Sequence, residues 1–250
     1  MANLRRYLAA GFLLFMFVLW GGASWLSDGF LAKACSAIFA AGDLIAAIAL
    51  LRRWFWGRWF GLGIGLVGSL NTVAWLGLGN WSTDPMLVIQ GVGFALLFVM
   101  LLGDGMRAQF ELRRSASNHW DFTRPGMQLL SWAVVLNIAT APELLAYGCM
   151  SATGLGVAAR AVAIASAAAL AIAVVLVVMC RAAGVLLMTA AGVATVVLGI
   201  LGLPVLTASH DPSQVLVTLT ALTAFPPGIL GALASAVVFA RPIVRFLRAE

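Results

Sequence analysis

Four charged side chains fall within long apolar runs of the sequence, where they could carry chemistry. Asp43 lies about midway along its run and Glu143 lies near the end of another, whereas Lys33 and Arg160 lie close to the start of theirs. A charge in hydrocarbon is costly unless it is paired or hydrated, and such residues mark ion or substrate paths in membrane proteins. We expect Glu143 to pair with Arg160, which lies at a similar depth, and we expect no basic partner for Asp43. The alternative role for these residues is to hold neighbouring helices together.

Uncharged polar groups and two prolines add further candidates. Asn71, Gln90 and Asn137 also lie within apolar runs, where interhelical hydrogen bonding is their default role. Pro226 and Pro227 follow each other in the last run and remove two backbone donors. The pair predicts either a kinked helix or a broken helix, and broken helices form midplane substrate sites in transporters. The sequence leaves both alternatives open.

The composition is that of a membrane protein. Hydrophobic residues make up 63% of the 250 residues and charged residues only 10%, whereas an ordinary soluble domain is about 25% charged. With a mean hydropathy of +1.04, the chain has too little polar surface for a water-soluble globule. We predict an all-α membrane protein with eight transmembrane helices, because the apolar runs are about 20 residues long. The predicted spans are 7–26, 31–51, 59–79, 86–103, 127–147, 158–180, 184–206 and 215–240.

The positions of the basic residues predict the orientation. Thirteen of the fifteen Lys and Arg residues fall on one side of the membrane, and only Lys33 and Arg160 fall on the other. Because cytoplasmic loops carry an excess of Lys and Arg, we predict that the N- and C-termini are both cytoplasmic. Lys33 is the only lysine, and such an arginine bias is typical of GC-rich bacterial genomes. The expected location is the bacterial inner membrane, with the lipid bilayer as a partner.

A dense cluster of arginine and tryptophan lies between the second and third predicted spans. The cluster consists of Arg52, Arg53, Trp54, Trp56, Arg58 and Trp59. Tryptophan rings favour the headgroup layer of a membrane, and arginine side chains there meet anionic lipid. We therefore predict a lipid-interface anchor, and we expect no nucleic-acid binding from so short a turn.

The sequence aligns with itself at a shift of 127 residues. The matches include Lys33 with Arg160 and the motif Ser82–Pro85 with Ser209–Pro212, in a chain that has few charged residues. Since each half contains four predicted spans, the halves should be parallel repeats related by an axis along the membrane normal. We predict a first four-helix repeat at 1–105, a cytoplasmic linker at 106–125 and a second repeat at 126–250.

The repeated motif places Asp84 and Asp211 in two equivalent outer loops, with His210 beside the second. Aspartate before proline favours a turn that starts a helix, which is the structural interpretation. The functional alternative is an ion site formed by two symmetry-related aspartates, to which His210 would add pH sensitivity.

Short segments of the first half carry a family resemblance. They are Arg5-Arg6, the acidic stretch Asp43–Leu51, and Gly91–Leu97 running on to Gly103–Gly105. With these segments, residues 5–110 resemble the DoxX-like family of four-helix membrane proteins. That family usually carries glutamate where Asp43 stands, and a lysine after the first span that has no clear counterpart in this chain. Because the family is named for a subunit linked to quinone-dependent thiosulfate oxidation, the resemblance implies a quinone-linked membrane subunit.

The sequence contains no motif of a known catalytic centre. No span contains histidine for haem ligation, and the three cysteines show no metal-ligand spacing. We expect no catalytic residue, no metal and no evident cofactor, with quinone or lipid as the remaining candidate ligands. The predicted function is a small transporter or an integral subunit of a larger membrane complex, with other membrane-protein subunits as partners. The alternative is a membrane-embedded subunit of a quinone-linked oxidoreductase.

Overall fold

The computed structural model describes residues 2–26, 28, 30–77, 85–111, 124–149, 156–206 and 212–248. All regular secondary structure within these residues is helical, which confirms the all-α prediction. Eight of the helices follow the eight predicted spans in order, and α5 is a short additional helix of 7 residues. The helices are α1 (Ala2–Leu26), α2 (Phe30–Leu51), α3 (Gly57–Gly77), α4 (Pro85–Leu101), α5 (Asp104–Phe110), α6 (Pro125–Cys149), α7 (Val157–Val178), α8 (Ala182–Leu206) and α9 (Pro212–Arg248).

Most of the long helices suit a bilayer. Six described helices have the length and apolar composition needed to cross one: α1, α3, α6, α7, Ala182–Ile200 of α8 and Thr220–Ala240 of α9. Leu87–Leu101 of α4 and α5 form a pair bent by 73° that would make a seventh, and Ser36–Leu51 of α2 is a shorter apolar helix. These helices indicate a multi-pass membrane protein. Eight crossings, cytoplasmic termini and a bacterial inner membrane stay predictions.

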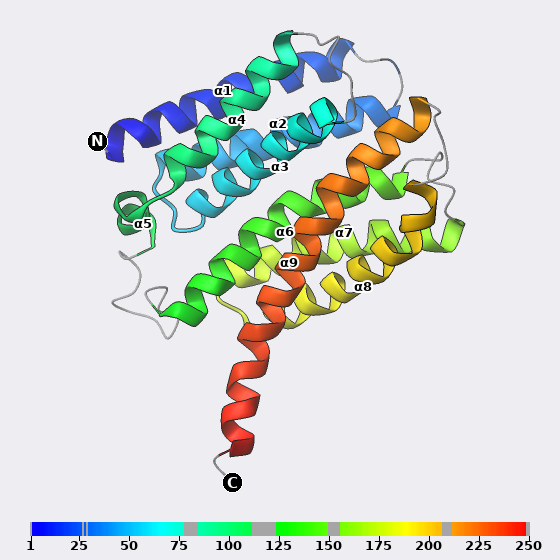
Figure 1. Ribbon diagram of the computed structural model, residues 1–250. Helices are drawn as coiled ribbons and strands as arrows, with labels where there is room; N and C mark the ends of the chain where they lie inside the picture. The colour runs from blue at the N-terminus through cyan, green and yellow to red at the C-terminus, as the bar shows by residue number, and fades with distance from the viewer. Residues whose placement is uncertain are drawn as a thin grey trace.

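The long helices form two groups of four with the same neighbour order (Figure 1). In the first group α1 packs on α2 and α4, while α3 packs on α4 and α2. In the second group α6 packs on α7 and α9, while α8 packs on α9 and α7. The groups meet where α3 contacts α6 and α9. A glycine permits this approach, because a Cβ atom on Gly63 of α3 would lie 2.7 Å from the Cβ atom of Ile138 on α6.

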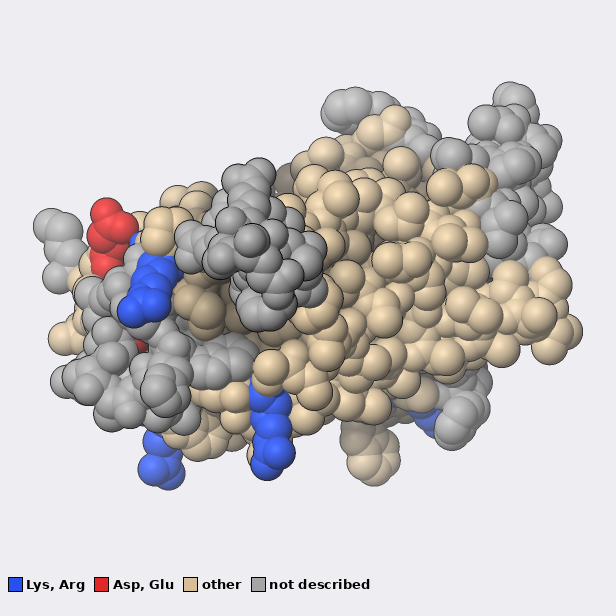
Figure 2. Space-filling model, turned by 90° about the horizontal axis from the view of Figure 1, so that it is seen from below, with Lys and Arg blue, Asp and Glu red and all other residues tan. Residues whose placement is uncertain are grey.

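Most of the charged side chains of the described residues lie at one end of the bundle. The N-terminus, the α2–α3 turn, α5 and the α7–α8 turn lie at this end, toward the left of Figure 1. In Figure 2 most of the blue Lys and Arg side chains lie toward the same side, and uncharged tan surface covers much of the remaining face. We term this end the arginine-rich end. Its position on the cytoplasmic side stays a prediction.

Two turns at the arginine-rich end have the same backbone conformation. Arg53 in the α2–α3 turn has a φ of 56°, and Cys180 in the α7–α8 turn, 127 residues later, has a φ of 57°. Non-glycine residues seldom adopt this left-handed region. Four backbone hydrogen bonds also recur at the same shift, donated by Arg52 and Met179, Arg53 and Cys180, Trp54 and Arg181, and Gly57 and Gly184. The sequence repeat therefore has a structural counterpart in these turns, while duplication of the whole chain stays a prediction.

Gly57 lies in the first of these turns and Gly184 in the second, and replacing either with alanine should destabilise the fold. A Cβ atom on Gly57 would lie 2.7 Å from the carbonyl carbon of Ala49, and one on Gly184 would lie 2.7 Å from the backbone nitrogen of Val177. Because relief requires the helices to separate, we expect Gly57→Ala and Gly184→Ala each to lower the Tm in detergent, with a loss of about 1–3 kcal/mol. Gly11→Ala is the matched control, since a Cβ atom there meets nothing within 4 Å. Equal Tm values for all three variants would contradict this packing.

Helix α9 runs without interruption through Pro226 and Pro227, so the predicted alternative of a broken helix is wrong. Packing on both sides explains this continuity. A Cβ atom on Gly228 would lie 2.9 Å from the side chain of Thr140 on α6 and 2.8 Å from that of Thr195 on α8. Neighbours this close hold the helical path, although two prolines remove two backbone hydrogen bonds. The alternative of a kink stays a prediction.

Candidate functional site

A cavity of about 800 Å³ lies between the two helix groups. Its walls come from α1, α2, α3 and α4 of the first group and from α6 and α7 of the second. Small-molecule sites have volumes of about 300–1,000 Å³ and are mostly apolar, with a few polar groups that fix the ligand. The described lining has this character, because most of it is aliphatic or aromatic.

Asp43 is the only charged side chain among the described residues that line the cavity. Helical spacing explains its position, because Ala40, Ala47 and Leu50 lie on the same face of α2 and are also buried. That face points into the protein, and Asp43 is only 3% exposed. Its carboxylate has no hydrogen bond or ion pair within the described part of the chain.

The amide of Asn137 lies behind the cavity wall. Its Nδ2 donates a hydrogen bond to the carbonyl oxygen of Ala133 at 2.7 Å, whereas its buried Oδ1 has no donor among the described residues. Asn137 also lines the cavity, but its side chain is fully buried, so its Oδ1 is not accessible to a ligand in this conformation.

Glu143 joins the two helix groups and does not form the predicted ion pair with Arg160. Its Oε1 accepts a hydrogen bond from Nδ2 of Asn71 on α3 at 2.8 Å, and its Oε2 accepts one from Oγ1 of Thr223 on α9 at 3.0 Å. Glu143 is 5% exposed. Asn71 lines the cavity as well, so this junction forms part of the cavity wall.

Arg160 binds the main chain of α6 instead of Glu143. Its Nε donates to the carbonyl oxygen of Gly148 at 3.1 Å, and its Nη2 donates to that of Cys149 at 3.2 Å. The last four carbonyl groups of a helix have no partner within the helix. A guanidinium group near the C-terminus of α6 satisfies them and complements the helix dipole, which explains why the predicted ion pair does not form.

The remaining candidates from the sequence lie elsewhere. Lys33 is exposed near the start of α2, where its carbonyl oxygen accepts a hydrogen bond from Oγ of Ser24 at 3.1 Å. Asp84, His210 and Asp211 fall outside the described residues, so the outer-loop ion site stays a prediction. Within the described ranges, no three His, Cys, Asp or Glu side chains come together to hold a metal ion.

Only part of the predicted lipid-interface anchor faces outward. Arg58 and Trp59 are buried, so their assignment to this anchor is wrong. Both belong to the first turn of α3, whose start is packed closely against α2 at Gly57, and this packing directs them inward. The outward-facing residues, which are exposed or half-buried, are Arg52, Arg53, Trp54 and Trp56.

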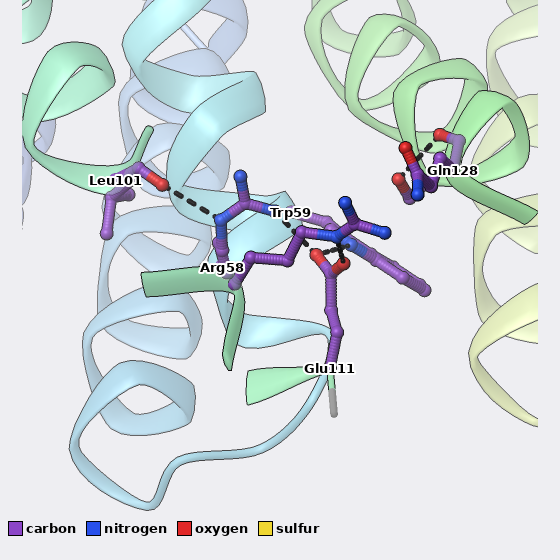
Figure 3. Close-up of polar contacts among 7 residues, drawn as sticks. Arg58, Trp59, Leu101, Glu111 and Gln128 are labelled. Atoms are coloured by element: carbon purple, nitrogen blue, oxygen red, sulfur yellow. Dashed lines mark hydrogen bonds and ion pairs between the residues drawn. The ribbon is translucent and has the colours of Figure 1, made fainter. Parts of the chain in front are cut away.

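Arg58 and Trp59 converge on Glu111, as Figure 3 shows. Nη1 of Arg58 lies 2.5 Å from Oε1 of Glu111, and Nε1 of Trp59 donates to the same oxygen at 2.9 Å. Arg107 adds an ion pair with Oε2 at 3.1 Å. In addition, Nε of Arg58 donates to the carbonyl oxygen of Leu101 at 2.8 Å. This Glu111 network fastens α3, the end of α4 and α5 together at the arginine-rich end.

Sequence reasoning missed Glu111 because residues 106–125 were predicted to form a polar linker. Two signals were available in this segment. Arg107 and Glu111 have the i, i+4 spacing of a helical ion pair. Met106 and Phe110 have the same spacing and are both buried against the bundle. Together they indicate a short amphipathic helix that packs on its neighbours.

No protein-family model, curated protein or solved structure matches this chain. Membership of the DoxX-like family therefore stays a prediction that rests on residues 5–110. The basis for inferring a function is the chemistry of the cavity, with its buried carboxylate and its aromatic walls.

Proposed function

We propose that this protein is a small membrane transporter whose substrate binds in the cavity beside Asp43. The observation that carries the proposal is the Asp43 carboxylate, which is buried, without a partner among the described residues, and adjacent to open volume. An unpaired charge in a membrane helix is costly, and such charges mark substrate and ion paths. A helix with a purely structural role would pack as well with an apolar residue at this position.

The arrangement of the helices also favours transport. The cavity lies between two four-helix groups, and many transporters bind their substrate at such an interface and move one group against the other. Asn71 both lines the cavity and donates a hydrogen bond to Glu143 on the other group. A ligand that competes for Asn71 would therefore weaken the contact between the groups.

The cavity reaches the apolar outer surface of the bundle. Ile45 of α2 and Val175 of α7 line it and are 47% and 54% exposed. In a membrane this surface meets lipid, so a substrate with an apolar body can enter from the bilayer.

Chemical labelling of a cysteine introduced into the cavity tests transport without knowledge of the substrate. Gly42 lines the cavity, and a Cβ atom there would meet nothing within 4 Å, so a cysteine fits at this position. The three native cysteines are first replaced by alanine. We then expect Gly42→Cys to react with a membrane-impermeant methanethiosulfonate reagent added to either side of sealed vesicles, because a transporter opens its site to both sides in turn.

The matched control is Ala46→Cys on the same helix. Ala46 is fully buried between packed helices and does not line the cavity, so we expect no reaction from either side. Reaction of Gly42→Cys from one side only, or from neither, would contradict transport and favour a structural subunit of a larger complex.

A further inference from the structure

The unpartnered carboxylate of the cavity specifies what its substrate must offer. The Asp43 carboxylate is a hydrogen-bond acceptor, and it has no donor among the described residues. A ligand that satisfies it must donate hydrogen bonds, and a positive charge on the ligand would be stabilised by the carboxylate. No Lys, Arg or His occurs among the described lining residues, so the cavity wall supplies no such charge itself.

The apolar lining specifies the body of the substrate. Aromatic faces attract cations as well as apolar groups, and this attraction strengthens when water is excluded. A volume of about 800 Å³ accommodates a drug-sized molecule. The aromatic side chains that line the cavity are Trp20, Phe39, Phe60, Trp75 and Phe94.

We infer that the cavity binds a lipophilic amine in its ammonium form, with the charge at Asp43 and the apolar body among the aromatic side chains. This inference rests on the proposed function, because it names the substrate class of the same site. A carboxylate ligand would be repelled by Asp43. A quinone offers only acceptors, whereas the Asp43 carboxylate needs a donor.

Three compounds of matched size test the charge requirement on the full-length protein in nonionic detergent: 4-phenylbutylamine, 4-phenyl-1-butanol and 4-phenylbutyrate. Isothermal titration calorimetry measures their affinities under identical conditions. We expect the amine to bind at least tenfold more tightly than the alcohol or the acid. Equal affinity for the alcohol would show that the cavity selects only apolar bulk, and tighter binding of the acid would show the opposite charge preference. Either result would overturn the inference.

Substitutions of cavity residues test whether the preference for the amine arises in the cavity. Asp43→Asn removes the charge with little change in volume, and we expect its amine affinity to fall at least tenfold, to that of the alcohol. Gly42→Leu places a bulky side chain next to Asp43 in the cavity and should weaken binding of the amine. Asp104→Asn is the control, because Asp104 is exposed on α5 and does not line the cavity. Unchanged amine affinity in a folded Asp43→Asn variant would overturn the inference. If that variant does not fold, the three compounds on the unaltered protein still decide.

The two proposals fail in distinguishable ways. Amine-selective binding combined with one-sided labelling of Gly42→Cys would keep the substrate class and overturn transport. Labelling from both sides without a preference for the amine would keep transport and overturn the substrate class.

Discussion

Replacing Glu111 with alanine is expected to destabilise the protein by about 3–5 kcal/mol. The Glu111 side chain is 1% exposed and accepts hydrogen bonds from Arg58 and Trp59. Without this carboxylate, the Arg58 guanidinium group remains as a buried charge without compensation, since its side chain is only 8% exposed. The loss is measured as a lower Tm in detergent, followed by intrinsic tryptophan fluorescence.

Arg107→Ala is the control for this prediction. The Arg107 side chain is 23% exposed, and its removal leaves Glu111 paired with Arg58, so we expect a loss of about 1 kcal/mol or less. The double variant Arg58→Met/Glu111→Leu should recover most of the lost stability, because apolar replacements of a buried ion pair are often neutral. A Tm for Glu111→Ala equal to that of Arg107→Ala would contradict the role assigned to the Glu111 network.

Replacing Glu143 with leucine is expected to lower stability by about 1–3 kcal/mol, which is the cost of leaving a buried hydrogen-bond donor without its acceptor. The carboxylate accepts hydrogen bonds from Asn71 on α3 and from Thr223 on α9. The single hydroxyl proton of Thr223 can be donated to the carbonyl oxygen of Thr220 instead, so the larger loss falls on Asn71. We expect a lower Tm than that of the unaltered protein under the same conditions.

The control is Glu143→Gln, which keeps one acceptor oxygen and should lose about half as much stability. A double-mutant cycle then tests the contact itself. If Asn71 and Glu143 act together, adding Asn71→Leu to Glu143→Leu should cost little beyond the single variant. Fully additive losses would show that the hydrogen bond between them contributes nothing.

Hydropathy alone predicted the order and approximate bounds of the long helices. In lipid each backbone N–H and C=O group must be satisfied within the protein, so an apolar run of about 20 residues has little alternative to a helix. The same requirement keeps α9 helical through Pro226 and Pro227, where close neighbours hold the backbone in place. The largest difference in bounds is at the C-terminal end of α9, which extends to Arg248.

The partners of buried polar side chains were not predictable from the same pattern. Glu143 and Arg160 are close in depth, but the face of α6 that carries Glu143 meets α3 and α9. Which faces meet depends on packing details such as the close approach at Gly63. Arg58 likewise fits an interface anchor by residue type, and only the fold shows that Glu111 lies next to it.

The cavity opens toward lipid at Ile45 and Val175. This opening determines whether binding depends on the ligand concentration in the lipid or in the water. A ligand that arrives through the hydrocarbon is present at its concentration in lipid, which for an amphiphile exceeds the aqueous concentration by its partition coefficient. An affinity expressed per volume of water will therefore change with the amount of lipid or detergent in the sample. An affinity expressed as a mole fraction in the lipid phase will stay constant.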